Sequence, residues 1–338
     1  MKTVIIGSGS WGTALGQVLA DNHQDVIIYG KEVDEIIDID KYHQNSKYFD
    51  RLYLNLELKA TISIETLKDA DIVVLSVPSG AIEEVCQQIN ELVEKPVIIV
   101  STAKGFHPVS FKRLSEVIQA SIDKEKLVAV VSLIGPSHAE EVVQRFLTTL
   151  NAVSDNNEAA ETVQKLFSND YFRVYTSDDI IGSEIGVAVK NIMAIASGIL
   201  AGLAIAGDNA KAALITRGLA EIVRYGLSKG GKLETFLGLT GIGDLIVTCT
   251  SEHSRNFQAG YQIGKYDNAK YFWENNTKTV EGVKACEIVY QDAKKMGIDM
   301  PIVEQVYKVL YEEEKPSLAI AKLMARELKP EKISHYSK

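Results

Sequence analysis

The sequence is poor in cysteine. Its 338 residues include Cys86, Cys249 and Cys286, and no two of these form a C-x-x-C pair. An odd number this small does not make a disulfide framework, and the missing paired spacing argues against a zinc site. The histidines also lack the spacing of metal ligands, so we expect no metal. A reducing, cytoplasmic location fits this composition best.

Long apolar runs are also lacking. The most apolar stretch, Ile192 to Gly207, has 16 residues, whereas a membrane span needs about 20. We interpret it as a buried helix. Near the N-terminus, the glycine-rich segment from Gly7 to Ser10 interrupts an apolar run that is too short for a secretion signal. We therefore expect neither a leader nor membrane insertion.

Positive charge is in deficit. The chain has 36 basic and 45 acidic residues, a formal net charge of −9. Such a chain has no net field that would hold nucleic acid or an anionic membrane. It can still gather a few cations in one pocket for a small anion.

The length exceeds the size at which a single core usually stops growing, which predicts two domains. In the first half, short β-branched runs alternate with helical patterns, which indicates a parallel sheet covered by helices. The expected strands are Thr3–Ile6, Asp25–Tyr29, Ile72–Val77, Val97–Ser101, Leu127–Leu133 and Phe172–Tyr175. Helices are expected between them at 11–22, 81–93, 110–121, 137–145 and 156–168.

Beyond about Ser177 the pattern becomes almost wholly helical. The expected helices are 178–206, 210–229, 255–265, 280–296, 302–311 and 316–327. The predicted fold is therefore a doubly wound α/β domain over residues 1–177, followed by an all-helical domain over 178–338. A ligand is expected at the carboxyl ends of the strands, in a cleft between the two domains.

A glycine-rich motif opens the chain. Gly7-Ser8-Gly9-Ser10-Trp11-Gly12 fits G-x-G-x-x-G, with a strand before it and an apolar helix after it. Gly7 permits the tight turn, Gly9 lets a pyrophosphate approach the backbone, and Gly12 lets the helix pack on the strand. The helix N-terminus then offers N–H groups to phosphates. The motif predicts a Rossmann-type dinucleotide site.

The end of the second expected strand bears on the choice of cofactor. An acidic residue there would bind the ribose 2′-hydroxyl of NAD, whereas a basic one suits the 2′-phosphate of NADP. Lys31 comes first and favours NADPH, but Glu32 is adjacent and could be the ribose partner. Both cofactors stay open, with a preference for NADPH.

Two segments at strand ends carry candidate chemistry. Lys104 follows the strand Val97–Ser101, where a ligand is expected, although an exposed loop lysine is the alternative. After the next strand, Ser137 and Glu140 have the spacing of a capping box, which predicts a helix that begins there. We treat His138 as non-catalytic.

The second half carries further candidates. Lys190 interrupts an apolar helix, and an interior lysine is costly unless it is paired or functional. Asp244 lies in a glycine-bounded apolar turn, and Ser254-Arg255-Asn256 follows it. Because Arg suits phosphate through its planar fork of donors, these residues could complete an anion pocket. Taken singly, each also has a structural explanation.

In combination, the chain resembles the bacterial NAD(P)-dependent glycerol-3-phosphate dehydrogenase family over nearly its whole length. The shared motifs are Gly-Ser-Trp-Gly-Thr-Ala-Leu (9–15), Ala-Lys-Gly (103–105), Gly-Pro-Ser-His-Ala-Glu-Glu (135–141), Lys-Asn (190–191), Gly-Asp-Asn-Ala-Lys-Ala-Ala-Leu (207–214), Thr-Arg-Gly-Leu-Ala-Glu (216–221), Gly-Ile-Gly-Asp-Leu (241–245), Ser-Arg-Asn (254–256) and Val-Glu-Gly (280–282). The resemblance implies reversible hydride transfer between dihydroxyacetone phosphate and sn-glycerol 3-phosphate for phospholipid synthesis. It also implies a homodimer.

The resemblance assigns roles by matching position. Lys190 takes the role of proton donor and acceptor. The implied substrate contacts are Lys104, Gly135, Ser137, Lys190, Asp244, Ser254, Arg255 and Asn256. The cofactor contacts are Gly7, Gly9, Ser10, Trp11, Gly12, Lys31, Lys104, Ala139, Arg255, Thr279 and Glu281.

Two positions depart from the family pattern. Val187 stands where the family usually has a glycine, and the segment from Asn191 to Gly207 is one residue longer than usual. The first departure bears on helix packing near Lys190, and the second bears on the geometry of the loop.

The chemistry of a lysine suits the implied reaction. During reduction negative charge grows on the ketone oxygen, and an ammonium at Lys190 can stabilise that charge and donate a proton. Oxidation needs the neutral amine, which burial and the cations Lys104 and Arg255 would favour. We therefore expect alkaline pH to favour oxidation. The alternatives are a ketopantoate-type or 3-hydroxy-acid reductase with the same two-domain plan and, from another class, a non-catalytic NAD(P)-sensing regulator.

Overall fold

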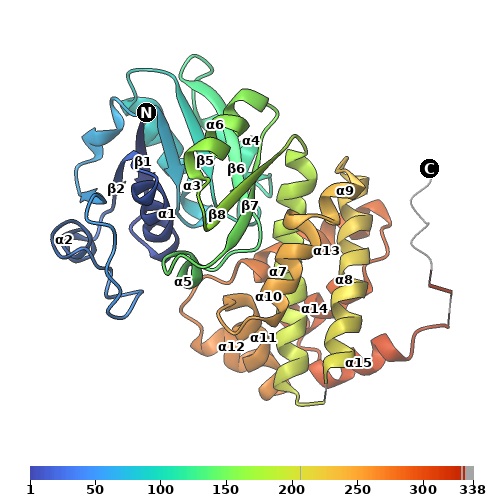
Figure 1. Cartoon of the computed structure of the whole chain (residues 1–338). Coiled ribbons are helices and arrows are strands. Elements are labelled where there is room, and N and C mark those ends of the chain that lie inside the picture. The colour runs from blue at the N-terminus through green and yellow to red at the C-terminus, as the bar shows by residue number, and fades with distance from the viewer. Residues whose placement is uncertain (206, 329, 332–338) are drawn as a thin grey trace. The chain divides into compact units, whose positions relative to one another are not determined.

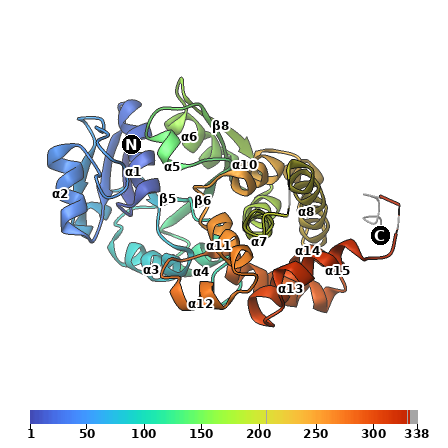
Figure 2. The same cartoon turned by 90° about the horizontal axis from the view of Figure 1, so that it is seen from below.

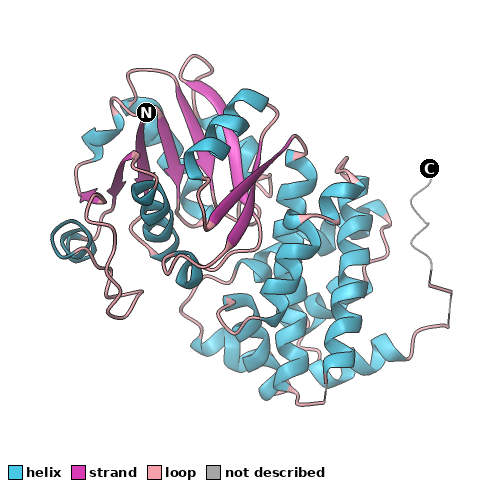
Figure 3. Ribbon diagram, viewed as in Figure 1, coloured by secondary structure: helices cyan, strands magenta, loops and turns pink. Residues whose placement is uncertain are grey.

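The computed structural model describes residues 1–205, 207–328 and 330–331. Contacts between residues divide the chain into unit 1, Met1–Ile180, and unit 2, Ile181–Lys338. The sequence placed the boundary a few residues earlier, after residue 177. Every strand of the described chain lies in unit 1, and unit 2 is helical over its described residues (Figure 3).

Unit 1 is built on one eight-stranded sheet with the order β3-β2-β1-β4-β5-β6-β7-β8 (Figure 1). All neighbouring pairs are parallel except β6 and β7. The order reverses between β1 and β4, which is the switch point at which doubly wound sheets bind ligands. The strands are β1 (Lys2–Ile6), β2 (Asp25–Tyr29), β3 (Lys59–Thr61), β4 (Ile72–Leu75), β5 (Val97–Ser101), β6 (Leu127–Ile134), β7 (Thr148–Val153) and β8 (Phe172–Ser177).

Helices cover both faces of this sheet. They must do so because successive apolar side chains of β1 point to opposite faces. Ile5 packs in the core that lies beneath α1 and α6, whereas Val4 and Ile6 point to the opposite core beneath α3 and α4. The helical elements are α1 (Ser10–Asp21), α2 (Val33–Tyr42), η1 (Ile64–Leu67), η2 (Ser79–Ala81), α3 (Ile82–Leu92), α4 (Leu114–Ser121), α5 (Ala139–Val142) and α6 (Asn157–Phe167). The expected doubly wound domain is confirmed.

The six predicted strands are present, but the sequence did not reveal β3, β7 or α2. The expected parallel sheet is confirmed for every neighbouring pair of strands but one: β7 runs antiparallel to β6, with Leu133 opposite Ala152. The reason is local. A helix of only four residues, α5, separates the two strands. It is too short to carry the chain back to the other end of the sheet, as a parallel crossover requires.

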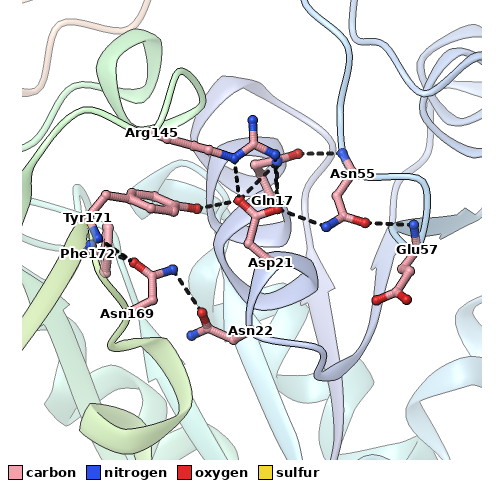
Figure 4. A network of polar contacts seen from close by, with 9 residues as sticks. All are labelled: Gln17, Asp21, Asn22, Asn55, Glu57, Arg145, Asn169, Tyr171 and Phe172. Carbon is pink, nitrogen blue, oxygen red and sulfur yellow. Dashed lines mark hydrogen bonds and ion pairs between the residues drawn. The ribbon is translucent and has the colours of Figure 1, made fainter.

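A polar network ties the segment after α5 to the end of α1 (Figure 4). Arg145 binds the carboxylate of Asp21 through two nitrogens, at 2.8 and 3.0 Å. Tyr171 and Asn55 donate to the same carboxylate at 2.7 and 2.8 Å. Although burial opposes it, these hydrogen bonds together hold the pKa of Asp21 below its usual value. The network fixes the chain that leads out of α5 against the helix that begins at the glycine-rich loop.

Unit 2 is built around one central apolar helix, α7. In Figure 2, α7 is seen end-on with α8, α10 and α11 around it. All its residues from Gly182 to Ile199 are buried, which confirms the predicted buried helix. The helical elements are α7 (Ile180–Gly202), α8 (Asp208–Ser228), α9 (Leu233–Phe236), η3 (Leu239–Gly243), α10 (Asp244–Thr250), α11 (Arg255–Lys265), α12 (Lys270–Asn275), α13 (Glu281–Met296), α14 (Pro301–Tyr311) and α15 (Pro316–Met324).

Two segments of the described chain are long and apolar enough to cross a membrane by composition, Ile180–Gly202 and Leu233–Thr250. The first is α7, and 83% of its most apolar window is buried inside the protein. Helix α7 begins before the 16-residue apolar run and lies within the expected helix 178–206. Residue 206, which lies in the segment expected to be one residue too long, falls outside the described residues.

Helices α7 and α11 touch backbone to backbone through glycines. A Cβ atom on Gly198 would lie 2.0 Å from the carbonyl oxygen of Phe257, and one on Gly260 would lie 2.0 Å from that of Ile195. Since real Cβ atoms do not approach so closely, only glycine fits at these two positions. The contact fixes α11 against the helix that carries Lys190.

A buried glutamate joins α8 to α14. The two carboxyl oxygens of Glu221 accept the backbone N–H groups of Ile302, at 2.7 Å, and Val303, at 3.2 Å. These N–H groups belong to the first turn of α14, which has no intrahelical acceptors for them. Burial raises the pKa of Glu221 to about 8, although the two backbone hydrogen bonds oppose the shift.

Candidate functional site

The glycine-rich loop has the shape that its sequence predicts. Gly7 has a φ of +118°, in the region that favours glycine, and a Cβ on Gly12 would lie 2.0 Å from the carbonyl oxygen of Gly7. Around Gly9 there is open space, since a Cβ there would meet nothing within 4 Å. Gly9 is the N-cap of α1 and provides no side-chain cap. A phosphate can therefore approach the N-terminal N–H groups of α1.

The end of β2 lies beside this loop. A Cβ on Gly30 would come within 2.5 Å of the Ser8 hydroxyl. Lys31 and Glu32, which follow, are both exposed. Glu35 in α2 is buried, accepts a hydrogen bond of 2.5 Å from Ser8 and pairs with Lys47 at 2.5 Å. Glu35 is thus a carboxylate near the loop that the sequence did not single out.

The ends of β5 and β6 bring two predicted substrate residues into contact. The Lys104 ammonium donates to the carbonyl oxygen of Gly135 at 3.0 Å. Gly135 has a φ of +151°, and a Cβ on it would lie 2.9 Å from Leu150. Lys104 is half-buried rather than extended into solvent. The alternative of an exposed loop lysine is therefore wrong.

The predicted capping box at Ser137 is also wrong. The N-cap of α5 is His138, one residue later, and it forms no side-chain cap. The Ser137 hydroxyl donates instead to the carbonyl oxygen of Gly135 at 3.2 Å. The helix begins at Ala139 and ends at Val142, and it is therefore shorter at both ends than the expected 137–145.

In unit 2 the predicted catalytic lysine is buried and paired. The Lys190 ammonium lies 2.6 Å from Oδ1 of Asp244, and the two side chains are 2% and 1% exposed. It also donates to the Thr248 hydroxyl at 2.6 Å, which in turn donates to the Asp244 carbonyl oxygen at 2.6 Å. A nearby carboxylate favours the charged form of lysine. The arrangement holds an ammonium in a dry pocket.

A π-helical turn, η3, delivers Asp244 to this position. The turn packs against α7 at Gly186, where a Cβ would lie 2.6 Å from the carbonyl oxygen of Thr240. Val187, the residue that departs from the family pattern, is buried within α7. The close approach to η3 thus depends on Gly186, and the valine leaves the pairing of Lys190 with Asp244 intact.

The predicted Ser254-Arg255-Asn256 group begins α11. Ser254 is its N-cap and accepts the Phe257 N–H at 3.3 Å. Arg255 is exposed, whereas Asn256 is buried and accepts the Gly282 N–H at 2.8 Å. A Cβ on Gly282 would lie 2.6 Å from the Asn191 carbonyl oxygen. Asn256 therefore lies close to the residue that follows Lys190.

The other predicted cofactor residues are spread over both units. In unit 1, Ser10 and Trp11 open α1, and Ala139 is the buried first residue of α5. In unit 2, Thr279 is exposed and Glu281 begins α13. Within unit 1, Gly7, Gly9 and Gly12 lie together in the glycine-rich loop and the first turn of α1, and Lys104 lies together with Gly135 and Ser137. Within unit 2, Lys190 lies against Asp244.

Sequence reasoning assigned no role to two polar neighbours of the predicted catalytic lysine. Thr248 contacts its ammonium directly, and Asn191 is 2% exposed with an Nδ2 group that has no hydrogen-bond partner among the described residues. Thr248 lies four residues after Asp244, a spacing that places both on one face of a helix. That spacing is the signal that could have identified it.

Comparisons with known proteins support this interpretation over nearly the whole chain. Residues 2–160 match the family model described as NAD-dependent glycerol-3-phosphate dehydrogenase N-terminus, and residues 179–321 match the C-terminus model of the same family. A glycerol-3-phosphate dehydrogenase [NAD(P)+] of Listeria monocytogenes is 50% identical over 335 residues, which cover 98% of each chain.

Solved structures agree. The crystal structure of a glycerol-3-phosphate dehydrogenase from Coxiella burnetii has a TM-score of 0.87 at 35% identity, covering 96% of this chain and 99% of that one. A ketopantoate reductase from Ralstonia eutropha, covering 96% and 100%, has a TM-score of 0.58 at 15% identity and thus shares the fold alone. This chain belongs to the NAD-dependent glycerol-3-phosphate dehydrogenase family and is an oxidoreductase.

Proposed function

We propose that this enzyme reduces dihydroxyacetone phosphate to sn-glycerol 3-phosphate, reversibly, with Lys190 as the proton donor and acceptor. The observation that carries the proposal is the buried ammonium of Lys190, held by Asp244 and Thr248 at 2.6 Å each. An isolated buried charge is unfavourable, so one that is kept charged by a carboxylate is suited to chemistry. The ammonium would stabilise the growing negative charge on the ketone oxygen and donate a proton to it.

A nicotinamide nucleotide fits the residues of unit 1. The open space at Gly9 and the uncapped start of α1 suit its pyrophosphate, and Ser10 and Trp11 open the same helix. The other proposed contacts are Gly7, Gly12, Lys31, Lys104, Ala139, Arg255, Thr279 and Glu281. When bound, the nucleotide supplies or accepts the hydride. We favour NADPH, because Lys31 lies two residues after the end of β2 and can bind a 2′-phosphate.

The substrate would be held through both ends. Arg255, Ser254 and Asn256 would bind its phosphate, since guanidinium groups bind phosphate with paired hydrogen bonds. Lys104, with Gly135 and Ser137 around it, would contact the substrate from unit 1, and Asp244 would line the pocket near Lys190.

The wider setting follows from the family. We propose that the enzyme works in the cytoplasm as a homodimer, without membrane insertion, metal or nucleic acid, and that its product serves phospholipid synthesis. The 83% burial of the most apolar window of α7 supports the part of this proposal that concerns the membrane.

A kinetic panel tests the reaction. Initial rates with dihydroxyacetone phosphate, unphosphorylated dihydroxyacetone and ketopantoate, each with NADPH and NADH, should show turnover dominated by the first ketone. Preference for ketopantoate would refute the assignment of substrate.

A pair of variants tests the lysine. Lys190→Ala should reduce kcat by at least about 10³-fold while the Kd for NADPH is retained. Lys229→Ala is the matched control, because Lys229 forms a partly exposed ion pair with Asp292 in the same unit. Near-normal turnover by Lys190→Ala would remove this residue from the mechanism.

A further inference from the structure

A buried asparagine forms hydrogen bonds with the glycine-rich loop from its buried side. Asn45, in the segment after α2, is 1% exposed. Its Nδ2 donates to the carbonyl oxygen of Ser8 and to the Thr13 hydroxyl, both at 2.8 Å. A carbonyl oxygen can only accept, so the amide nitrogen must face the loop. The loop peptide between Ser8 and Gly9 is therefore fixed from the inside.

Further hydrogen bonds hold Ser8 in place. The Ser8 hydroxyl donates to Glu35 at 2.5 Å, while Thr13 donates to the Ser8 carbonyl oxygen at 3.3 Å. Ser8 is thus held through its side chain and its backbone, and it is itself 5% exposed. Such a residue has little freedom to rotate its peptide.

The hydrogen bond from Asn45 determines the orientation of the Ser8–Gly9 peptide group. The chain contains no cis peptide bonds among its described residues, and in a trans peptide the C=O and N–H groups point opposite ways. With the Ser8 oxygen turned inward to Asn45, the Gly9 N–H must point outward. It donates no hydrogen bond to any described residue, and the space around Gly9 is open.

We propose that Asn45 is a positioning residue for nucleotide binding, which aims the Gly9 N–H at the pyrophosphate. The proposal rests on the nucleotide site described above and adds a residue that does not itself touch the nucleotide. The Oδ1 atom of Asn45 is buried without a hydrogen-bond partner in the described chain, which costs free energy. Packing alone would therefore favour an apolar side chain at this position. The presence of an amide despite that penalty supports a role in directing the loop.

The first test removes the donor. Asn45→Ala should raise the Kd for NADPH, measured by fluorescence titration of the full chain, by about tenfold or more. The KM for dihydroxyacetone phosphate and kcat at saturating NADPH should stay close to wild type, because the loop is intact once the nucleotide is bound. A folded Asn45→Ala protein whose Kd lies within about twofold of wild type would overturn the proposal.

Gln17→Ala is the matched control. Gln17 is another fully buried amide of unit 1, and it donates to Asp21 at the far end of α1 at 3.1 Å. Its loss should lower the thermal unfolding temperature without changing the Kd for NADPH. Equal weakening of nucleotide binding by both variants would show general destabilisation and would count against a positioning role.

A conservative variant provides a rescue. In Asn45→Asp the new side chain can donate to the Ser8 oxygen only when it is protonated, and burial favours the protonated acid. The ratio of its Kd for NADPH to that of wild type should fall from about pH 8 to about pH 6. A raised ratio that is independent of pH would contradict the proposal. Failure of wild type to bind either nucleotide would instead refute the proposed function.

Discussion

The Lys190 ammonium and the Asp244 carboxylate form an ion pair of 2.6 Å that is almost wholly removed from solvent. Burial alone would disfavour both charges, and each offsets that cost for the other. The pair also gives the ammonium a fixed position, because Thr248 accepts a second of its protons. Under the proposed mechanism, Asp244 would therefore act on the reaction through the lysine.

Asp244→Asn should reduce kcat for ketone reduction by about 100-fold or more. The change keeps the shape of the side chain but leaves a buried ammonium without its counter-charge, and breaking a buried pair costs about 3–5 kcal/mol. Steady-state kinetics measure the effect. Asp292→Asn is the control, since the ion pair between Lys229 and Asp292 is 31% exposed on both sides, and a comparable loss of kcat in that control would weaken the assignment.

Oxidation of glycerol 3-phosphate should accelerate as pH rises. In that direction Lys190 must accept a proton, which requires the neutral amine, and the Asp244 carboxylate favours the charged form instead. From the sequence, only burial and neighbouring cations were expected to act on the protonation of Lys190, and this carboxylate acts in the opposite direction. The pH profile of the oxidation rate in Asp244→Asn should accordingly shift toward lower pH. An oxidation rate that is flat from about pH 7 to about pH 10, with chemistry limiting, would contradict the role.

Arg255→Ala should discriminate between phosphorylated and unphosphorylated substrates. Loss of a guanidinium that binds phosphate should cost about 3 kcal/mol in kcat/KM for dihydroxyacetone phosphate. Activity on dihydroxyacetone should barely change, because that ketone has no phosphate to lose. The comparison of the two kcat/KM values measures the effect, and equal losses would show that Arg255 does not bind phosphate.

Folding stability should fall between about pH 5 and about pH 8 through Glu221. Burial raises its pKa in the folded protein from 4.5 to about 8, so the native state keeps a proton that the unfolded chain releases. The stabilisation is complete below about pH 4.5 and is lost as pH rises toward 8. Urea unfolding over this range should show a decline of at most about 1.4 kcal/mol per pH unit from this group.

Glu221→Gln removes the titration and should flatten that decline. Its stability at pH 5 should fall by about 1–3 kcal/mol, because an amide cannot accept both backbone N–H groups of α14. The same slope in the variant and in wild type would show that another group is responsible.

Periodicity and turn chemistry were sufficient for most of the fold. Long β-branched runs such as Ile72–Val77 identified their strands, and the apolar segment after Ile192 identified the central helix. The missing strand β3 has three residues, Lys59–Thr61, too few for a pattern. The direction of β7 depended on the length of α5, which ends at Val142 rather than at the expected residue 145.

The site was accessible to sequence reasoning where a residue type was out of place. A lysine within an apolar helix and an acid in a glycine turn were conspicuous, but nothing local showed that they meet. Their pairing depends on how α7 and η3 pack. Asn45 gave no signal at all, because an asparagine in a polar loop is unremarkable until its partner, a carbonyl oxygen 37 residues away, is seen.

The glycine contact between α7 and α11 has a consequence for selectivity. No side chain separates the two backbones, so the spacing from Lys190 to the start of α11 cannot adapt by rotamer changes. Under the proposed assignment, the backbone positions of the proton donor and of the phosphate-binding residue are therefore a fixed distance apart. A ketone with one more carbon between carbonyl and phosphate would reach one of these two groups but not the other.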